Sequence, residues 1–263
     1  MRVLGEHDIR YIEMRGVNGR SLVEHSLDEI RVIKKSLDSQ GFGISAVGSP
    51  IGKIGITDDF APHLDLFRHT LAAADILESR YIRMFSFYIP KGEEPADYRG
   101  EVLHRWQQFV DAAADSGRVL LHENEKGIYG DTAERCFDLL DTLQCPYVRA
   151  TFDPANFIQC GEETYPEAYE RLRPYIEYFH IKDARLGDGQ VVPAGYGDGR
   201  ITEMLQSLAA DGWKGFLSLE PHLGSFSGLA SLERDGDMLE MPEGGPEKFA
   251  VAVNALKDIL RSI

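Results

Sequence analysis

The sequence predicts an α/β protein built as a TIM-type parallel β/α barrel, and three observations support this fold class. Short apolar segments alternate with longer segments of helical periodicity along the whole chain. Most of the short segments are nearly continuous apolar runs, which is typical of strands buried on both faces of a parallel sheet. No low-complexity tract or Pro/Ser-rich linker interrupts the alternation, so we expect residues 1–263 to form a single domain.

Composition narrows the class of protein. With 263 residues, 43% of them hydrophobic, the chain can bury an ample core without disulfides. Its three cysteines form no CxxC pair. Its first ten residues lack the apolar stretch of a signal peptide. No apolar run approaches the length of about 18 residues that a membrane span needs. We therefore expect a cytoplasmic protein with no membrane segment. A net charge of -15 would repel phosphate backbones, so nucleic acid is not an expected partner.

Seven segments have the composition of strands, each followed by a predicted helix. They are Ile9–Arg15, Gly43–Ser49, Tyr81–Phe87, Val119–Asn124, Tyr147–Asn156, Tyr178–Ala184 and Gly215–Pro221. A barrel of this kind has eight strands. Because residues 2–8 resemble the end of a helix, we expect the first strand to be absent. The first and last of the seven strands would then each lack a neighbour, and a second copy of the chain or a partner chain could cover this open edge. A start codon assigned too late is the other explanation.

Helix boundaries are indicated by capping residues. Ser26 with Glu29, and Asp131 with Glu134, have the spacing of capping boxes. Three prolines fit first-turn positions and three glycines fit C-terminal caps: Pro62, Pro166, Pro246, Gly41, Gly117 and Gly212. Two glycine-rich segments, residues 15–21 and 195–200, lack a phosphate-binding pattern, and we interpret them as turns.

Four potential metal ligands recur at equivalent places in four successive strand segments. Glu123, Asp153, His180 and Glu220 each stand at the end of an apolar strand, 30, 27 and 40 positions apart. Parallel strands of a closed barrel direct their C-terminal ends to one face, so these residues are expected to converge there. Buried carboxylates need compensation, and a divalent cation would provide it for three carboxylates and one imidazole. This donor set favours Mn²⁺, with Mg²⁺, Co²⁺ or Zn²⁺ as alternatives.

An alternative interpretation needs no metal. Each carboxylate could pair with a barrel cation such as Arg15, Arg83, Arg149 or Lys182, and His180 could be an ordinary buried histidine. Ion pairing alone gives no reason for four such residues to recur at equivalent strand ends, which is why we prefer the metal site.

The segments around these ligands carry a resemblance to a known family. They read HEN around Glu123, FDPAN around Asp153, HIKDA around His180 with a following GYGDG, and LEPH around Glu220. From Ile9 onward they resemble the xylose-isomerase-like barrel superfamily of sugar phosphate isomerases and epimerases. That superfamily also contains ketose 3-epimerases, inosose and dehydroshikimate dehydratases, and endonuclease IV.

The resemblance implies an activity and further site residues. It implies a metal-dependent isomerase or epimerase of a keto-sugar or keto-polyol, acting in carbohydrate metabolism by proton abstraction next to a metal-bound carbonyl. Glu123 and Glu220 would be both ligands and catalytic groups. The expected substrate-binding residues are Asn156, Lys182, Arg185 and His222. Lys182 could instead form an ion pair with Asp183, and His122 is expected to point away from the site.

The sequence departs from the ketose epimerases at one point. They tend to have a histidine three residues after the metal aspartate, whereas this chain has Asn156, whose side chain does not titrate. A metal-dependent dehydratase or lyase acting on a keto-polyol or 3-keto-glycoside is therefore the main alternative. A non-catalytic partner subunit and an endonuclease IV-like DNA repair enzyme are the remaining ones.

Overall fold

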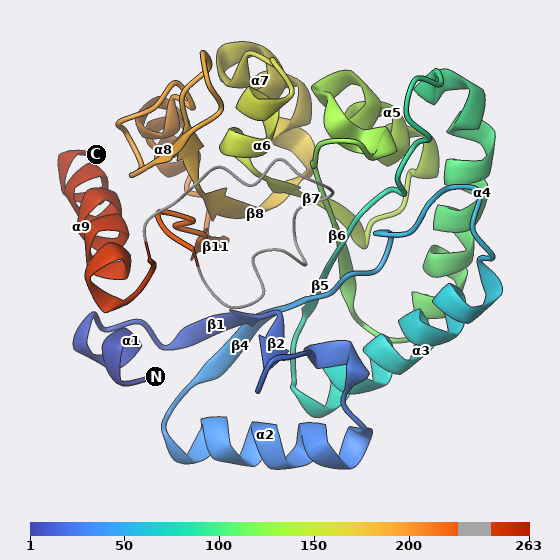
Figure 1. Cartoon of the computed structure of the whole chain (residues 1–263), viewed down its shortest axis with the longest axis horizontal. Helices are drawn as coiled ribbons and strands as arrows, with labels where there is room; N and C mark the ends of the chain where they lie inside the picture. The colour runs from blue at the N-terminus through green and yellow to red at the C-terminus, as the bar shows by residue number, and fades with distance from the viewer. Residues whose placement is uncertain (226–242) are drawn as a thin grey trace. The chain divides into compact units, whose positions relative to one another are not determined.

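The computed structural model describes residues 1–225 and 243–263 (Figure 1). The chain groups into two compact units, each of which is described by itself. Unit 1 comprises Met1–Ile9, Asp153–Glu170 and Phe179–Ile263, and unit 2 comprises Arg10–Phe152 and Arg171–Tyr178. The single domain expected from the sequence stays a prediction.

Seven strands form one sheet in the order β1-β4-β5-β6-β7-β8-β11. Their bounds are Tyr11–Met14 (β1), Gly43–Gly48 (β4), Tyr81–Met84 (β5), Val119–Glu123 (β6), Val148–Phe152 (β7), Ile176–Ile181 (β8) and Phe216–Leu219 (β11). Pairing from β1 through β7 is parallel. The seven predicted strand segments each contain one of these strands, and among the described residues before β1 there is only a short helix, α1 (Arg2–Glu6). The predicted seven-stranded parallel β/α barrel is confirmed.

In unit 2 the helices alternate with strands and lie along their outer side (Figure 1). They are α2 (Leu27–Ser39), α3 (Ala61–Ile76), α4 (Pro95–Ala113) and α5 (Ala133–Leu143). The capping box of Ser26 and Glu29 is confirmed. The one predicted at Asp131 is wrong by one residue, because Thr132 is the N-cap and its hydroxyl accepts the N–H of Arg135.

The core of unit 2 beneath α3 and α4 is largely aromatic. Trp106, Phe109, Phe67 and Phe87 are fully buried, and Phe67 and Phe109 approach to 4.8 Å between ring centroids. Rings of this size bury large apolar areas and lock each other's orientation. Phe87 lies in the loop that follows β5, and its ring stacks on that of Phe109 with the centroids 6.0 Å apart, so this core holds that loop in place.

In unit 1, α6 (Pro154–Gln159) and a π-helical turn (Thr164–Ala168) follow β7. The two-stranded β9 (Asp183–Ala184) and β10 (Val191–Val192) and then α8 (Ile201–Ala210) follow β8, and α9 (Pro246–Ser262) comes after β11. The short helix α7 (Tyr169–Leu172) spans the boundary of the two units. Pro246 occupies the first turn of α9 as predicted, and Gly212 after α8 is left-handed with φ of 68°. Pro166 lies inside the π-helical turn that precedes α7, and Tyr165 before it is extended, with φ of -141° and ψ of 131°.

The first glycine-rich segment is a turn, as predicted. β2 (Gly16–Val17) and β3 (Arg20–Ser21) pair antiparallel around Asn18 and Gly19, whose φ angles are 54° and 75°. Two successive residues with positive φ favour a tight hairpin turn, for which Asn-Gly is the preferred sequence. No phosphate-binding role is needed to explain it.

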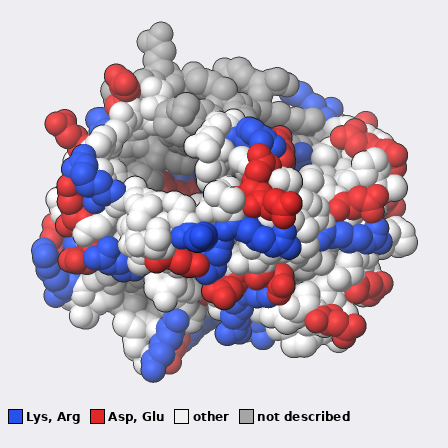
Figure 2. Space-filling view, turned by 90° about the horizontal axis from the view of Figure 1, so that it is seen from below, with Lys and Arg blue, Asp and Glu red and all other residues white. Residues whose placement is uncertain are grey.

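The exterior carries both signs of charge close together. Figure 2 shows Lys and Arg next to Asp and Glu over the face that it draws. Arg31–Asp28, Lys34–Asp38 and Arg99–Asp138 are ion pairs of this kind, 2.6–2.8 Å long. Among the helices of residues 1–225 and 243–263, none has the length and apolar composition that a bilayer crossing requires.

His63 makes the stability of unit 2 depend on pH. Its Nε2 accepts the N–H of Gly52 at 2.7 Å, and burial, with a contribution from nearby Arg105, lowers the pKa of His63 from 6.5 to about 4. Between these values the unfolded chain takes up a proton that the folded chain does not. The free energy of unfolding should therefore fall as the pH drops from about 6.5 to about 4.

His63→Gln should flatten this dependence, because the amide can accept the same N–H without titrating. Urea unfolding at a series of pH values measures it, with His104→Gln, at an exposed histidine of α4, as the control. An unchanged slope in the His63 variant, equal to that of the control, would contradict the assignment.

Candidate functional site

Four buried side chains gather their ligand atoms at the C-terminal ends of strands. Glu123 is the last residue of β6, Asp153 directly follows β7, His180 is the penultimate residue of β8, and Glu220 directly follows β11. One ligand atom from each lies within 4.8 Å of those of the other three. Two oxygens on opposite sides of an ion at about 2.2 Å stand about 4.4 Å apart, so the spacing suits one metal ion.

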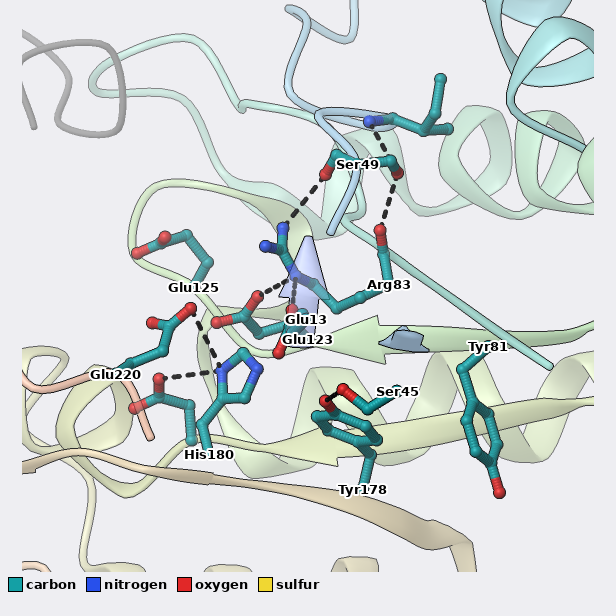
Figure 3. Close-up of polar contacts among 12 residues, drawn as sticks. Glu13, Ser45, Ser49, Tyr81, Arg83, Glu123, Glu125, Tyr178, His180 and Glu220 are labelled. Carbon is teal, nitrogen blue, oxygen red and sulfur yellow. Dashed lines mark hydrogen bonds and ion pairs between the residues drawn. The ribbon is translucent and has the colours of Figure 1, made fainter. Parts of the chain in front are cut away.

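Asp153 is placed by the local sequence. Pro154 follows it in the first turn of α6, and Asp153 is the N-cap of that helix, with its Oδ1 accepting the N–H of Asn156 at 2.9 Å. The other oxygen, Oδ2, lies 3.4 Å from Nδ1 of His180. Nδ1 of His180 is also 3.9 Å from Oε1 of Glu220, and Figure 3 shows this imidazole facing the carboxylates.

Lys182 lies next to Asp153 and Glu220, two of the candidate ligands that belong to unit 1. Its ammonium is 2.9 Å from Oδ2 of Asp153 and 3.5 Å from Oε2 of Glu220, and it donates to Oδ1 of Asn156 at 2.8 Å. Only 6% of the Lys182 side chain is exposed. Asn156 is thus held by Lys182, and the two predicted substrate-binding residues act on each other at the edge of the cluster.

Lys182 contacts Asp153, Glu220 and Asn156, whereas its chain neighbour Asp183, considered as its ion-pair partner, is bound by the backbone. The Asp183 carboxylate accepts four backbone N–H groups, from Ala184, Gly195, Gly197 and Gly199, at 2.8–3.1 Å. Burial raises the pKa of Asp183, and these N–H groups act in the opposite direction. A Cβ at Gly199 would lie 2.6 Å from Oδ1 of Asp183, so the second glycine-rich segment is needed to wrap this carboxylate, as a turn.

In unit 2, Glu123 pairs with a buried arginine. Nε of Arg83, on β5, is 3.0 Å from Oε2 of Glu123 and 3.1 Å from Oε1 of Glu13, on β1. The exposed fractions of these side chains are 3% for Arg83 and 4% for each glutamate. Barrel cations therefore do pair with the candidate ligands, as the alternative interpretation anticipated for Arg83 and Lys182.

The charges of these contacts nevertheless fit a divalent cation. Arg83 forms ion pairs with both Glu13 and Glu123. Lys182 likewise lies within ion-pair distance of both Asp153 and Glu220. Each of these two cations therefore pairs with two carboxylates. Buried carboxylates repel one another and need more positive charge than a shared cation supplies. Three carboxylates with one imidazole form the hard, oxygen-rich donor set of Mn²⁺, Mg²⁺ or Zn²⁺ sites, so the residues present could hold such an ion.

The remaining predicted residues differ in placement. His222 has φ of 36°, and its Nε2 is 3.9 Å from Oε2 of Glu220, so it lies beside the cluster. Arg185 is exposed on the loop between β9 and β10 and donates to Gln190, outside this buried network. His122 points away as expected: its Nε2 meets the Ser86 hydroxyl at 2.9 Å, and burial lowers the pKa of His122 to about 4.

Glu13 is a residue of this network that the sequence did not predict, and Arg83 was expected only as a possible counter-charge. Glu13 stands within a strand segment whose neighbours are apolar, and a charged residue in such a segment is the signal that could have identified it.

Comparisons with known proteins assign the family. The family model described as "Xylose isomerase-like TIM barrel" matches residues 1–240. A 3-dehydroshikimate dehydratase of Bacillus anthracis is 19% identical over 183 residues, which span 70% of this chain and 65% of that protein's length.

Two of the similar solved structures show the shared fold. A D-tagatose 3-epimerase-like protein has a TM-score of 0.76 at 18% identity, covering 99% of this chain and 92% of that one. The IOLI protein with a binding zinc atom has a TM-score of 0.75 at 16% identity, covering 99% and 91%. The chain belongs to the xylose isomerase-like TIM-barrel family.

Proposed function

We propose that this chain is a metal-dependent isomerase or epimerase of a keto-sugar or keto-polyol. One observation carries the proposal: two glutamates, Glu123 and Glu220, offer ligand atoms in the same buried group as Asp153 and His180. A reaction that moves a proton at a carbon beside a carbonyl needs a base and an acid within reach of that carbon. Two carboxylates at one metal site provide this pair.

Each residue has a distinct task in this scheme. Glu123 or Glu220 removes the proton from the carbon next to the carbonyl, and the other returns a proton to the same carbon or its neighbour. Asp153 and His180 serve as ligands only. When bound, the divalent ion would polarise the carbonyl and stabilise the negative charge that develops on its oxygen. Asn156 and Lys182, with His222 beside Glu220, would hydrogen-bond substrate hydroxyls.

Mn²⁺ is the ion we propose, with Mg²⁺, Co²⁺ and Zn²⁺ as the alternatives to test. Three carboxylates favour a hard ion, and one imidazole is compatible with all four. The structural relative with a zinc atom supports a metal in this fold.

Exchange of a carbon-bound hydrogen tests the proposed reaction. The Mn²⁺-loaded protein is incubated in D₂O with a panel of keto-hexoses and keto-polyols, and products are followed by NMR and mass spectrometry. We expect an epimer or isomer carrying deuterium at the carbon next to the carbonyl. Turnover that persists after chelation, or the absence of exchange across the panel, would overturn the proposal.

A dehydratase or lyase is the second candidate, and two observations favour it. Asn156 cannot titrate and is held by Lys182, unlike the histidine that the ketose epimerases tend to have. The curated relative is a 3-dehydroshikimate dehydratase. The same incubation distinguishes the two, because elimination gives an unsaturated product together with released water or aglycone, whereas isomerisation keeps every heavy atom of the substrate and changes its mass only by the deuterium taken up.

A further inference from the structure

Glu123 is contacted by a buried arginine that lies outside the candidate ligand group of Glu123, Asp153, His180 and Glu220. Arg83 reaches it from the neighbouring strand, with Nε 3.0 Å from Oε2 of Glu123. Both side chains are almost completely buried, with 3% and 4% exposed. At that depth the contact is shielded from water, so the guanidinium constrains how the Glu123 carboxylate is turned.

Arg83 is in turn fixed on several sides. Its Nε also meets Oε1 of Glu13 at 3.1 Å, and its Nη1 donates to the carbonyl of Ser49 at 3.0 Å (Figure 3). The Ser49 hydroxyl donates back to the carbonyl of Arg83 at 2.7 Å. The guanidinium also lies over the ring of Phe85, 4.8 Å from its centroid. These contacts hold the guanidinium in one plane.

The backbone leaves room for this arrangement. Gly48, at the end of β4, has no Cβ, and a Cβ there would lie 2.7 Å from Cγ of Arg15, 3.0 Å from Nη2 of Arg83 and 3.3 Å from Oε1 of Glu13. All three contacts would be tighter than ordinary packing allows. The sequence therefore keeps a small residue where the guanidinium and the second glutamate meet.

Building on the proposed function, we infer that Arg83 is a positioning residue for Glu123 and that Glu13 positions Arg83. A structural ion pair would need only one carboxylate, whereas this guanidinium nitrogen is shared between Glu13 and a residue of the candidate metal group. Contacting one oxygen of Glu123 fixes the plane of its carboxylate and so the direction in which the group meets a metal ion or a substrate proton.

The test compares Arg83→Lys, Arg83→Met, Glu13→Gln and the double variant with the wild-type protein. Arg105→Met is the matched control. Arg105 is also a buried arginine of unit 2, but it pairs with Glu101 and the carbonyl of Asp58. Three readouts are measured for each variant: Mn²⁺ affinity by calorimetry, thermal unfolding, and kcat and KM on the compound of the keto-sugar panel that the wild-type protein turns over. A crystal structure of the Arg83→Met variant is compared with the wild type.

We expect Arg83→Met to weaken Mn²⁺ binding by about 10–100-fold and to lower kcat more than it changes KM, with a smaller effect for Arg83→Lys. Arg105→Met should lose thermal stability but keep its Mn²⁺ affinity. Glu13→Gln should lower Mn²⁺ affinity by itself yet raise the thermal stability of the Arg83→Met variant, because the double variant no longer buries the Glu13 charge without its arginine.

The crystal structure separates this inference from the proposed function. A Glu123 carboxylate turned away from its wild-type orientation in Arg83→Met supports the positioning role, even if the wild-type protein binds no Mn²⁺ and the proposed function fails. An unmoved Glu123 carboxylate, or wild-type Mn²⁺ affinity and kcat in a folded Arg83→Met variant, would overturn it.

Discussion

Replacing Glu220 or Glu123 with glutamine is expected to lower kcat by about 10²–10⁴-fold, the range usually lost with a general acid or base. The amide keeps the size of the side chain but cannot take a proton, and it is a poorer metal ligand than a carboxylate. Steady-state assays with saturating Mn²⁺ measure the loss, and Mn²⁺ titration of the same variants separates weaker metal binding from lost proton transfer.

The control for these variants is Glu177→Gln. Glu177 is also a glutamate of a sheet strand, near the start of β8, where it accepts from Tyr81 at 2.8 Å and from Arg80 at 3.0 Å. It is absent from the candidate ligand group. The control should retain wild-type kcat. Turnover above a tenth of the wild-type value in both Glu123→Gln and Glu220→Gln would rule out their proposed roles.

Removal of the metal should abolish turnover and lower thermal stability together. The ion binds the folded chain, in which the four ligands meet, so its contribution follows mass action and reaches about 2.7 kcal/mol at a free concentration one hundred times Kd. Calorimetric melting of chelated protein, with Mn²⁺ added back in steps, measures the shift. Asp153→Asn, which alters one ligand, should show a much smaller shift than wild type.

A melting temperature that does not respond to divalent ions would contradict the metal site. If the melting temperature of the wild-type protein is independent of Mn²⁺, Mg²⁺, Co²⁺ and Zn²⁺, then Arg83 and Lys182 compensate the carboxylates without an ion. The interpretation as buried ion pairs would then stand in place of the metal site.

The sheet was predictable because buried parallel strands are continuous apolar runs, whose composition does not depend on distant contacts. The convergence of Glu123, Asp153, His180 and Glu220 followed from the same rule, since parallel strand ends meet on one face. The cap of α5 was harder, because Asp131 and Thr132 are both good N-cap residues and only the backbone conformation at Thr132 decides between them.

Contacts between side chains on different elements could not be predicted. The sequence was compatible with an ion pair between Lys182 and its chain neighbour Asp183. In the structure, three N–H groups of the glycine-rich segment and the N–H of Ala184 bind the Asp183 carboxylate, and the Lys182 ammonium lies beside Asp153 and Asn156. No local pattern encodes that choice. The same holds for Glu13 and Arg83, which lie 70 residues apart in sequence and meet through strand order.

A crystal structure of the Mn²⁺-soaked protein, with anomalous diffraction to locate the ion, tests the central claim most directly. Our account predicts one strong peak per chain, with one atom each of Glu123, Asp153, His180 and Glu220 at about 2.0–2.3 Å from it. A fully ordered group of the same four side chains with no peak at saturating Mn²⁺, or a peak held by other residues, would contradict the account.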